Sequence, residues 1–341
     1  MPAIKDVAKL ANVSVGTVSR YLHNPENLTP AYRARVRAAI EELHYQPSRL
    51  AQSLRTKKTN MIALVVPELL NQFYIELYNS IRTACYQHGY IPIMYTMESG
   101  RDMLQHLFAG NGATQIDGMI LAFMDDAESL ALIRQISGET PYIFMSSQTS
   151  AAVSYSHILS DTYTGAYDAA CHLISLGHTR IACIGHEDNH LNMDEKLNGI
   201  RKAFREHSID FDSAYYASGP STYATGYHAA SRFMRMEVPP TAIFAGNDMI
   251  AVGVLKYLAE YQHRVPQDVA VVGFDGIQLS TICTPALTTV VQPIEAMGTA
   301  AVKSLLGRIA REEKARTQIV FKPTLAVRQS TDAGAPTVLE I

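Results

Sequence analysis

A chain of 341 residues, 47% hydrophobic and 18% charged, has the size for two or three domains and the composition of an ordinary globular protein. No apolar run reaches the roughly 18 residues that a membrane helix needs, so no membrane partner is expected. The formal net charge of −3 by itself argues against nucleic-acid binding. However, residues 1–60 carry ten Lys and Arg against four acids, a charge of +6, which leaves −9 on residues 61–341. This uneven distribution predicts phosphate contact at one end of the chain.

The first residues predict two helices joined by a short turn. Apolar residues recur at the spacing of one helix face, at Ile4, Val7, Ala8 and Ala11. Residues 12–14 form the turn, and Ser14 is the expected N-cap of the second helix. In that helix, Val18, Tyr21 and Leu22 share one face, while the opposite face carries Gly16 and Arg20 flanked by Thr17 and Ser19. An Arg can donate two hydrogen bonds to a guanine edge, so this face is predicted to read bases in the major groove.

A third helix is predicted to cover the first two. Thr29 is its expected cap and Pro30 its first residue. Its apolar stripe consists of Val36, Ala39, Ile40 and Leu43. Arg33, Arg35 and Arg37 either reach phosphates or belong to a solvated face, and the sequence leaves both readings open.

From residue 61 onward, short apolar runs alternate with amphipathic stretches, which predicts parallel sheets with helices on both faces. The strand-like runs are Met61–Val66, Ile91–Tyr95, Gly118–Leu121, Tyr142–Met145, Ile181–Gly185, Thr241–Phe244 and Val269–Phe274. The helical stretches lie near 73–88, 161–176, 194–207, 222–235, 247–261 and 293–310.

Candidate ligand residues follow these runs, because open α/β sheets bind ligands at the carboxyl ends of their strands. Phe73 and Tyr74 follow the first run and either stack on a sugar or base ring or simply begin an amphipathic helix. Asn247 and Asp275 follow two later runs, and Asp248 is expected to cap the next helix.

Several of these segments together resemble the LacI/GalR family of bacterial transcription regulators, over nearly the whole chain. The matching blocks are Ile4–Ala8, Val13–Ser14, Thr17–Arg20, Leu176–His178, Asn247–Asp248, Pro266, Asp268 and Val271–Asp275. The resemblance implies an α/β protein with an N-terminal three-helix helix-turn-helix head, a hinge helix, and a two-lobed core like that of periplasmic binding proteins, with parallel sheets.

The resemblance also implies the domain boundaries. Residues 1–47 are the DNA-binding domain, 48–60 the hinge helix and linker, and 61–341 the effector-binding and dimerisation core. Lobe one spans about 61–160 plus 291–322, and lobe two about 161–290 plus 323–330. The chain is expected to cross between the lobes near 160, 290 and 323.

The head and hinge would contact operator DNA. The DNA-contacting residues that the resemblance implies are Lys5, Ser14, Val15, Gly16, Thr17, Ser19, Arg20, Asn27 and Leu54. Val15 and Gly16 occupy positions that set operator preference. Leu54, in the short segment 48–55, would wedge into the minor groove. The alternative is a linker whose Leu50 and Leu54 pack on the core.

The cleft between the lobes would bind a sugar-like effector, with Asn247 and Asp275 at the family's effector positions. The full set of expected effector residues is Phe73, Tyr74, Ser146, Lys196, Asn247 and Asp275. Three departures from the family leave the effector unidentified. Lys196 stands where the family often has an Arg, and it lacks the planar bidentate geometry of Arg. Gly276 replaces a common second Asp, and residues 146–149 are small and polar.

One metal motif stands apart from this pattern. His186-Glu187-Asp188-Asn189-His190 matches the zinc-protease pattern, which requires both histidines on one helix. Because the segment directly follows a predicted strand, we expect a strand-to-helix loop, and neither a metal nor another cofactor. A cleft enzyme and an exported sugar-binding protein are the alternative classes. The latter requires a signal sequence, and none is seen.

We therefore expect a cytoplasmic homodimer that acts as a transcription regulator, usually a repressor in this family, on a pseudo-palindromic operator. Its four scattered cysteines, with no Cys-x-x-Cys pair, indicate reduced thiols. The tail at residues 331–341 has no leucine heptads, so a tetramer through a C-terminal bundle is not expected.

Overall fold

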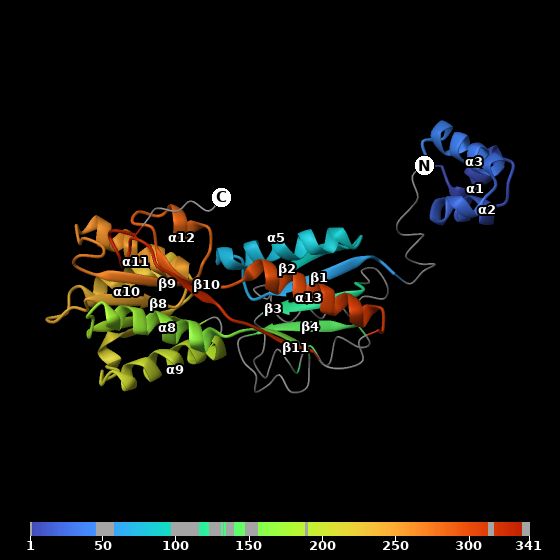
Figure 1. Ribbon diagram of the computed structural model, residues 1–341. Coiled ribbons are helices and arrows are strands. Elements are labelled where there is room, and N and C mark those ends of the chain that lie inside the picture. Colours follow the sequence, from blue (N-terminus) through green and yellow to red (C-terminus); the bar gives the residue numbers. More distant parts are fainter. Residues whose placement is uncertain are drawn as a thin grey trace. The chain divides into compact units, whose positions relative to one another are not determined.

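The computed structural model describes residues 2–45, 58–96, 116–122, 131, 133, 140–146, 156–187, 190–312 and 317–335. The chain forms two compact units, Met1–Thr59 and Asn60–Ile341 (Figure 1). Leu54 and most of the predicted hinge lie outside the described residues, so the domain boundaries at 47 and 60 stay predictions. Among the described helices, none combines the length and the apolar character that crossing a membrane requires.

The first unit is a three-helix head. It contains α1 (Ile4–Leu10), α2 (Val15–His23), the short 3-10 helix η1 (Pro25–Asn27) and α3 (Pro30–Glu42). Its buried core is Val7, Ala8, Ala11, Val18, Val36 and Ala39, which confirms the predicted packing of α3 on α1 and α2. The Ser14 side chain accepts from the Thr17 N–H, as predicted for an N-cap. Thr29 takes the N-cap position of α3 but makes no side-chain capping bond there.

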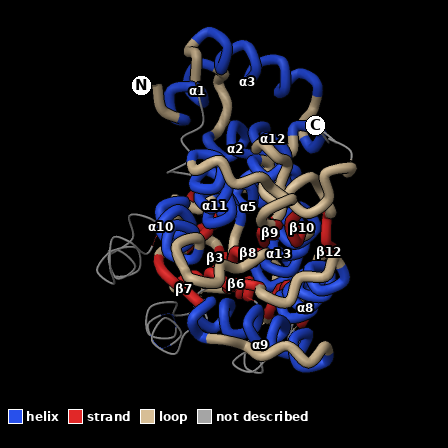
Figure 2. The backbone as a smooth tube through the Cα atoms, turned by 90° about the vertical axis from the view of Figure 1, so that its left-hand side faces the viewer, coloured by secondary structure: helices blue, strands red, loops and turns tan. Residues whose placement is uncertain are grey.

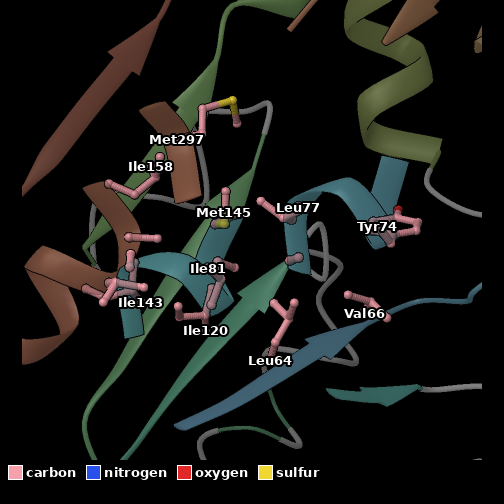
Figure 3. Packing of buried hydrophobic residues seen from close by; sticks show 14 of the residues in the cluster. Leu64, Val66, Tyr74, Leu77, Ile81, Ile120, Ile143, Met145, Ile158 and Met297 are labelled. Carbon is pink, nitrogen blue, oxygen red and sulfur yellow. The ribbon is translucent and has the colours of Figure 1, made fainter. Parts of the chain in front are cut away.

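The second unit contains two sheets. In the first, the strand order is β11-β5-β4-β3-β1-β2, and all neighbouring strands are parallel. These strands are β1 (Met61–Val66), β2 (Ile91–Thr96), β3 (Gly118–Ala122), β4 (Tyr142–Ser146), β5 (His157–Ser160) and β11 (Gln318–Phe321). Helices α5 (Gln72–Gln87) and α13 (Ile294–Ile309) pack together on one face of this sheet. Figure 3 shows part of the core between them, including Leu64, Leu77, Ile120 and Met297.

The second sheet has the order β12-β10-β9-β8-β6-β7, in which only β12 runs antiparallel. Its strands are β6 (Ile181–His186), β7 (Tyr216–Gly219), β8 (Ala242–Ala245), β9 (Ala270–Asp275), β10 (Thr288–Val291) and β12 (Thr324–Ala326). One core lies under α8 (Thr162–Ser175) and α9 (His190–Glu206). Another lies under α10 (Tyr223–Phe233) and α11 (Asp248–Glu260), so helices cover both faces (Figure 2). The short helices η4 (Ser213–Tyr215) and α12 (Leu279–Ile282) complete this lobe.

The chain passes between the two sheets three times. It leaves the first sheet after β5, returns after β10 to form α13 and β11, and leaves again to add β12. Each lobe is therefore built from segments that are far apart in the sequence. The residues on these crossings, Gln292 among them, lie between the lobes.

Candidate functional site

The predicted base-reading face of α2 is accessible to solvent. Val15, Gly16 and Arg20 are exposed, and Thr17 and Ser19 are half-buried. The hydroxyl of Ser14 is engaged in the head itself, because it accepts from the Thr17 N–H at 3.1 Å. Of the three predicted contacts outside this segment, Lys5 on α1 and Asn27 on η1 are exposed as well, and Leu54 lies outside the described residues.

Two of the three arginines of α3 are engaged within the head. Arg35 donates to the backbone carbonyls of Ala11 and Asn12, at 3.0 and 2.6 Å. These carbonyls end α1 and begin the turn, where Asn12 has a left-handed φ of 49°. Arg37 pairs with Glu41 at 2.9 Å on the exposed surface. Arg35 therefore ties α3 to the end of α1 and to the turn that follows it, a contact that the sequence does not reveal.

A second group of polar side chains gathers where the strand order of each sheet reverses, between β1 and β3 and between β6 and β8. Such reversal points leave a crevice at the carboxyl ends of the strands. The described residues that line a cavity here are Asn71, Phe73, Tyr74, His186, Asn192, Lys196, Ser221, Asn247, Asp275 and Gln292.

The structure thus brings together five of the six predicted effector residues. The exception is Ser146, which is fully buried at the end of β4 and is not one of the lining residues. Five lining residues are outside the predicted set: Asn71 before α5, His186 at the end of β6, Asn192 on α9, Ser221 in the loop after β7, and Gln292 on the β10–α13 crossing. For Asn192, Ser221 and Gln292, nothing in the local pattern distinguishes them from other polar residues of helices and loops.

The cavity that these residues line is small. Its volume is about 30 Å³, which holds a single water molecule. Pockets for small organic ligands are usually about ten times larger or more. A sugar therefore requires the lining side chains to separate.

Asp275 is the central group of this cavity. Its carboxylate accepts from Gln292 Nε2 at 2.8 Å and from Asn71 Nδ2 at 3.4 Å. Burial raises the pKa of Asp275, while Lys196, Gln292 and Asn71 act in the opposite direction. Its φ of 116° is rare for a residue with a side chain, so the surrounding structure holds this backbone in a strained form.

Lys196 is the cation of the site, and its ammonium group is already in contact with other groups of the protein. Nζ donates to Gly246 O at 2.8 Å, lies 3.4 Å from His186 Nε2, and stands 4.1 Å from the ring centre of Phe274. Burial lowers the pKa of Lys196 to about 8, although Asp275 and Asp248 favour its charged form. The ammonium thus lies among protein atoms, and the nearby Asp275 and Asp248 favour its charged form.

Asn247 both caps helix α11 and lines the cavity, whereas Asp248 does neither. Asn247 is the N-cap of α11, because its Oδ1 accepts from the Ile250 N–H at 2.8 Å. Among the described residues, its buried Nδ2 finds no hydrogen-bond partner, and it lies at the cavity. The expectation that Asp248 caps this helix is wrong, since its carboxylate accepts from Ile277 N–H and the Thr289 hydroxyl instead.

Phe73 and Tyr74 belong to the core and to the cavity wall at once. They form the first turn of α5, and only 3% and 8% of their surfaces are exposed. Their rings meet edge to face at 5.4 Å, and both pack in the hydrophobic core of the first lobe. Figure 3 places Tyr74 at one end of this cluster.

The glycine after Asp275 is required by the backbone. Gly276 has a φ of 75°, and a Cβ at this position would lie 2.6 Å from Val291 Cα. A second Asp, which the resemblance leads one to expect here, does not fit this loop.

The His-Glu-x-x-His segment does not form a metal site of the protease type. His186 ends strand β6 and His190 begins helix α9, so the two histidines do not share a helix. Within the part of the chain that the structure describes, no group of three potential metal ligands occurs.

Comparison with known proteins agrees with this architecture. Residues 3–48 match the model of the bacterial regulatory proteins of the lacI family, and residues 170–331 match a periplasmic binding protein-like domain. The chain is similar to the ribose operon repressor of Escherichia coli (strain K12), with 32% identity over 97% of this chain and 100% of that protein.

Two solved structures are also similar. The transcriptional regulator CelR in complex with cellobiose is 30% identical, with a TM-score of 0.73 over 97% of this chain and 100% of that one. The Lac repressor dimer bound to operator and the anti-inducer ONPF has a TM-score of 0.86 at 23% identity, over 97% of this chain and 99% of that one. At that identity the likeness shows a shared fold.

Proposed function

The chain belongs to the LacI family of bacterial regulatory proteins, and we propose that it is a homodimeric, cytoplasmic repressor that binds a pseudo-palindromic operator and responds to a sugar-like effector. It is a DNA-binding transcription regulator and not an enzyme. One observation carries the proposal: a helix-turn-helix head and a two-lobed core with a buried polar cavity occur in the same chain.

On the DNA side, Arg20 reads bases from the exposed face of α2, and Val15 and Gly16 set operator preference. Val15 is 40% exposed and offers apolar contact, which suits a thymine methyl group. Gly16 has no side chain to obstruct close approach to a base. Two heads on a two-fold axis read two half-sites.

On the effector side, the available groups favour an uncharged ligand rich in hydroxyl groups. Asp275 accepts hydrogen bonds, and Asn247 Nδ2, which has no partner among the described residues, donates them. The ammonium of Lys196 is occupied by protein atoms, and a phosphate is better bound by a free cationic fork. The cellobiose complex of the similar regulator CelR supports a sugar.

Effector binding would couple to DNA through the lobes. A ligand on Asp275 competes with Asn71, which lies in the other lobe. Changing this contact changes the relative stability of the lobe arrangements, and the coupling acts equally in both directions. An inducer weakens operator binding by this route, and a corepressor strengthens it.

The decisive experiment selects bound duplexes from a random DNA pool with the purified full-length protein. A repressor of the proposed kind enriches a palindrome with a flexible central step. The selection is run in parallel with cell metabolites added, so that a protein requiring a corepressor also yields a motif. Absence of any enriched motif under both conditions contradicts the proposal.

A further inference from the structure

Asp248 is fully buried at the start of α11, yet its carboxylate does not serve that helix. Oδ2 accepts from the Ile277 N–H at 2.9 Å, and Oδ1 accepts from the Thr289 hydroxyl at 2.5 Å. Both donors lie elsewhere in the second lobe, in the loop after β9 and on β10. Asp248 thus connects three segments beneath the cavity.

The loop that it holds carries the central carboxylate of the site. Asp275 and Gly276 have φ values of 116° and 75°. The value at Asp275 is unfavourable for a residue with a side chain unless the surrounding structure fixes it. The bond from Ile277 N–H to Asp248 fixes the residue that directly follows this pair. Without it, the loop loses the hydrogen bond nearest to the strained position.

Packing around the carboxylate is tight. A Cβ on Gly273 would lie 2.2 Å from Asp248 Oδ1, so strand β9 passes directly over this side chain. The described residues that line the cavity include Asn247 but not Asp248. Asp248 therefore acts beneath the site and not within it.

We propose that Asp248 is a positioning residue, which holds residues 275–277 so that the Asp275 carboxylate is presented to the cavity. This inference rests on the proposed role of Asp275 as an effector ligand. Two adjacent residues at the start of α11 thus have different roles. Asn247 lines the cavity, and Asp248 positions Asp275, which lines it too.

The chemistry of the replacement gives a sharp test. In Asp248→Asn, Oδ1 can still accept from Ile277 N–H while Nδ2 donates to the Thr289 hydroxyl oxygen. In Asp248→Ala, both bonds are lost. Because burial and the nearby Asp275 raise the pKa of Asp248, an uncharged amide of the same shape is a fitting conservative substitute.

The first measurement is amide hydrogen exchange of the full-length protein, which needs no effector. We expect Asp248→Ala to increase exchange at Ile277 at least tenfold and Asp248→Asn to stay within threefold of wild type. The matched control is Asn247→Ala, which removes the α11 cap and should expose Ile250 but not Ile277. An unchanged Ile277 in Asp248→Ala, or an equal rise in Asn247→Ala, overturns the proposal.

Thr289→Val provides a milder variant if Asp248→Ala does not fold. It removes one of the two donors that orient the carboxylate, and we expect about a threefold rise in exchange at Ile277. No rise counts against a positioning role.

The second measurement is release of operator DNA by D-ribose and by cellobiose, with Asp275→Ala as the reference. We expect Asp248→Ala to raise the half-maximal sugar concentration at least tenfold and Asp248→Asn to restore it, with operator affinity unchanged without sugar. A normal sugar response in Asp275→Ala would contradict the proposed effector site. The hydrogen-exchange measurement would then still test whether Asp248 positions the loop. A normal response in Asp248→Ala alone overturns the positioning role.

Discussion

The side-chain amide of Asn71 donates to Asp275 Oδ2 at 3.4 Å and so joins the two lobes through the candidate effector carboxylate. Nearby, the Gln278 N–H donates to Glu76 Oε1 at 2.7 Å. Both bonds connect the start of α5 with the loop after β9. The contact between the lobes is therefore made at the same place as the proposed contact with the effector.

We expect Asp275→Ala to abolish the response to effector while leaving operator binding intact. The carboxylate lies in the core unit, and the head folds around its own hydrophobic core. The measurement is operator affinity with and without the effector. Asp210→Ala, an exposed carboxylate of the same lobe, is the control, and a retained response in Asp275→Ala would remove this residue from the site.

Arg20→Ala is expected to cost about 1–3 kcal/mol of specific binding, the usual value of a bidentate contact to a base. Binding to random DNA should weaken little. Titration of the selected operator and of random duplexes checks this difference. Arg37→Ala removes an exposed arginine that pairs with Glu41 and serves as the control. Equal weakening on both DNAs would make Arg20 a phosphate contact.

Gly16→Ala is expected to stabilise the head by about 0.5 kcal/mol, because glycine in a helix costs more conformational entropy than alanine. The nearest atom to an added Cβ is Ser14 Oγ at 3.7 Å, so the methyl group fits. On DNA the same methyl group should change the preferred base at one symmetric pair of positions. Urea denaturation and a repeated selection measure the two effects, and a loss of stability would contradict the packing argument.

Arg35→Met should destabilise the head by about 1–2 kcal/mol, since it leaves two carbonyls at the turn without their charged donor. Arg35→Lys should recover only part of this loss, because an ammonium lacks the fork that reaches both carbonyls. Calorimetry of the full-length protein resolves the head transition. A complete rescue by Lys would show that charge, and not geometry, matters here.

Acid should destabilise the second lobe through His172 and His178. Burial lowers the pKa of both below the usual 6.5, so the folded state binds fewer protons than the unfolded state as pH falls below 6.5. The contribution of the two neutral histidines to the free energy of unfolding is present above pH 6.5. It is lost as pH falls toward their pKa values in the folded protein. The His172→Gln, His178→Gln double variant should show a smaller loss of urea stability between pH 7 and 5.5 than wild type, whereas exposed His88→Gln should not.

Strong local periodicity made most of the fold predictable. Amphipathic stretches placed α5, α8 and α11 within a few residues, and continuous apolar runs placed the central strands. The sequence analysis missed five short strands of three or four residues, because so few residues carry little pattern: β5 (His157–Ser160), β7 (Tyr216–Gly219), β10, β11 and β12. They become strands only because a neighbouring strand supplies hydrogen-bond partners.

The site residues also divide into those that a local pattern predicts and those that it does not. Asn247 and Asp275 were predicted from their places after strands and from the family resemblance. Gln292, Asp248 and Arg35 act on residues that lie 17, 29 and 24 positions away. Contacts at such separations depend on tertiary packing, which a single sequence does not display.

The order in which the segments leave the ribosome follows from the three crossings. The first lobe receives helix α13 and its edge strand β11 only after all strands of the second lobe except β12 have been synthesised. Met297, Ala301 and Leu305 of α13 belong to the first core, so until then one apolar face of the nascent sheet is exposed. Both lobes therefore reach completion almost together, when the last tenth of the chain emerges. A nonsense mutation between β10 and β11 leaves two unfinished lobes and a truncated chain prone to aggregation.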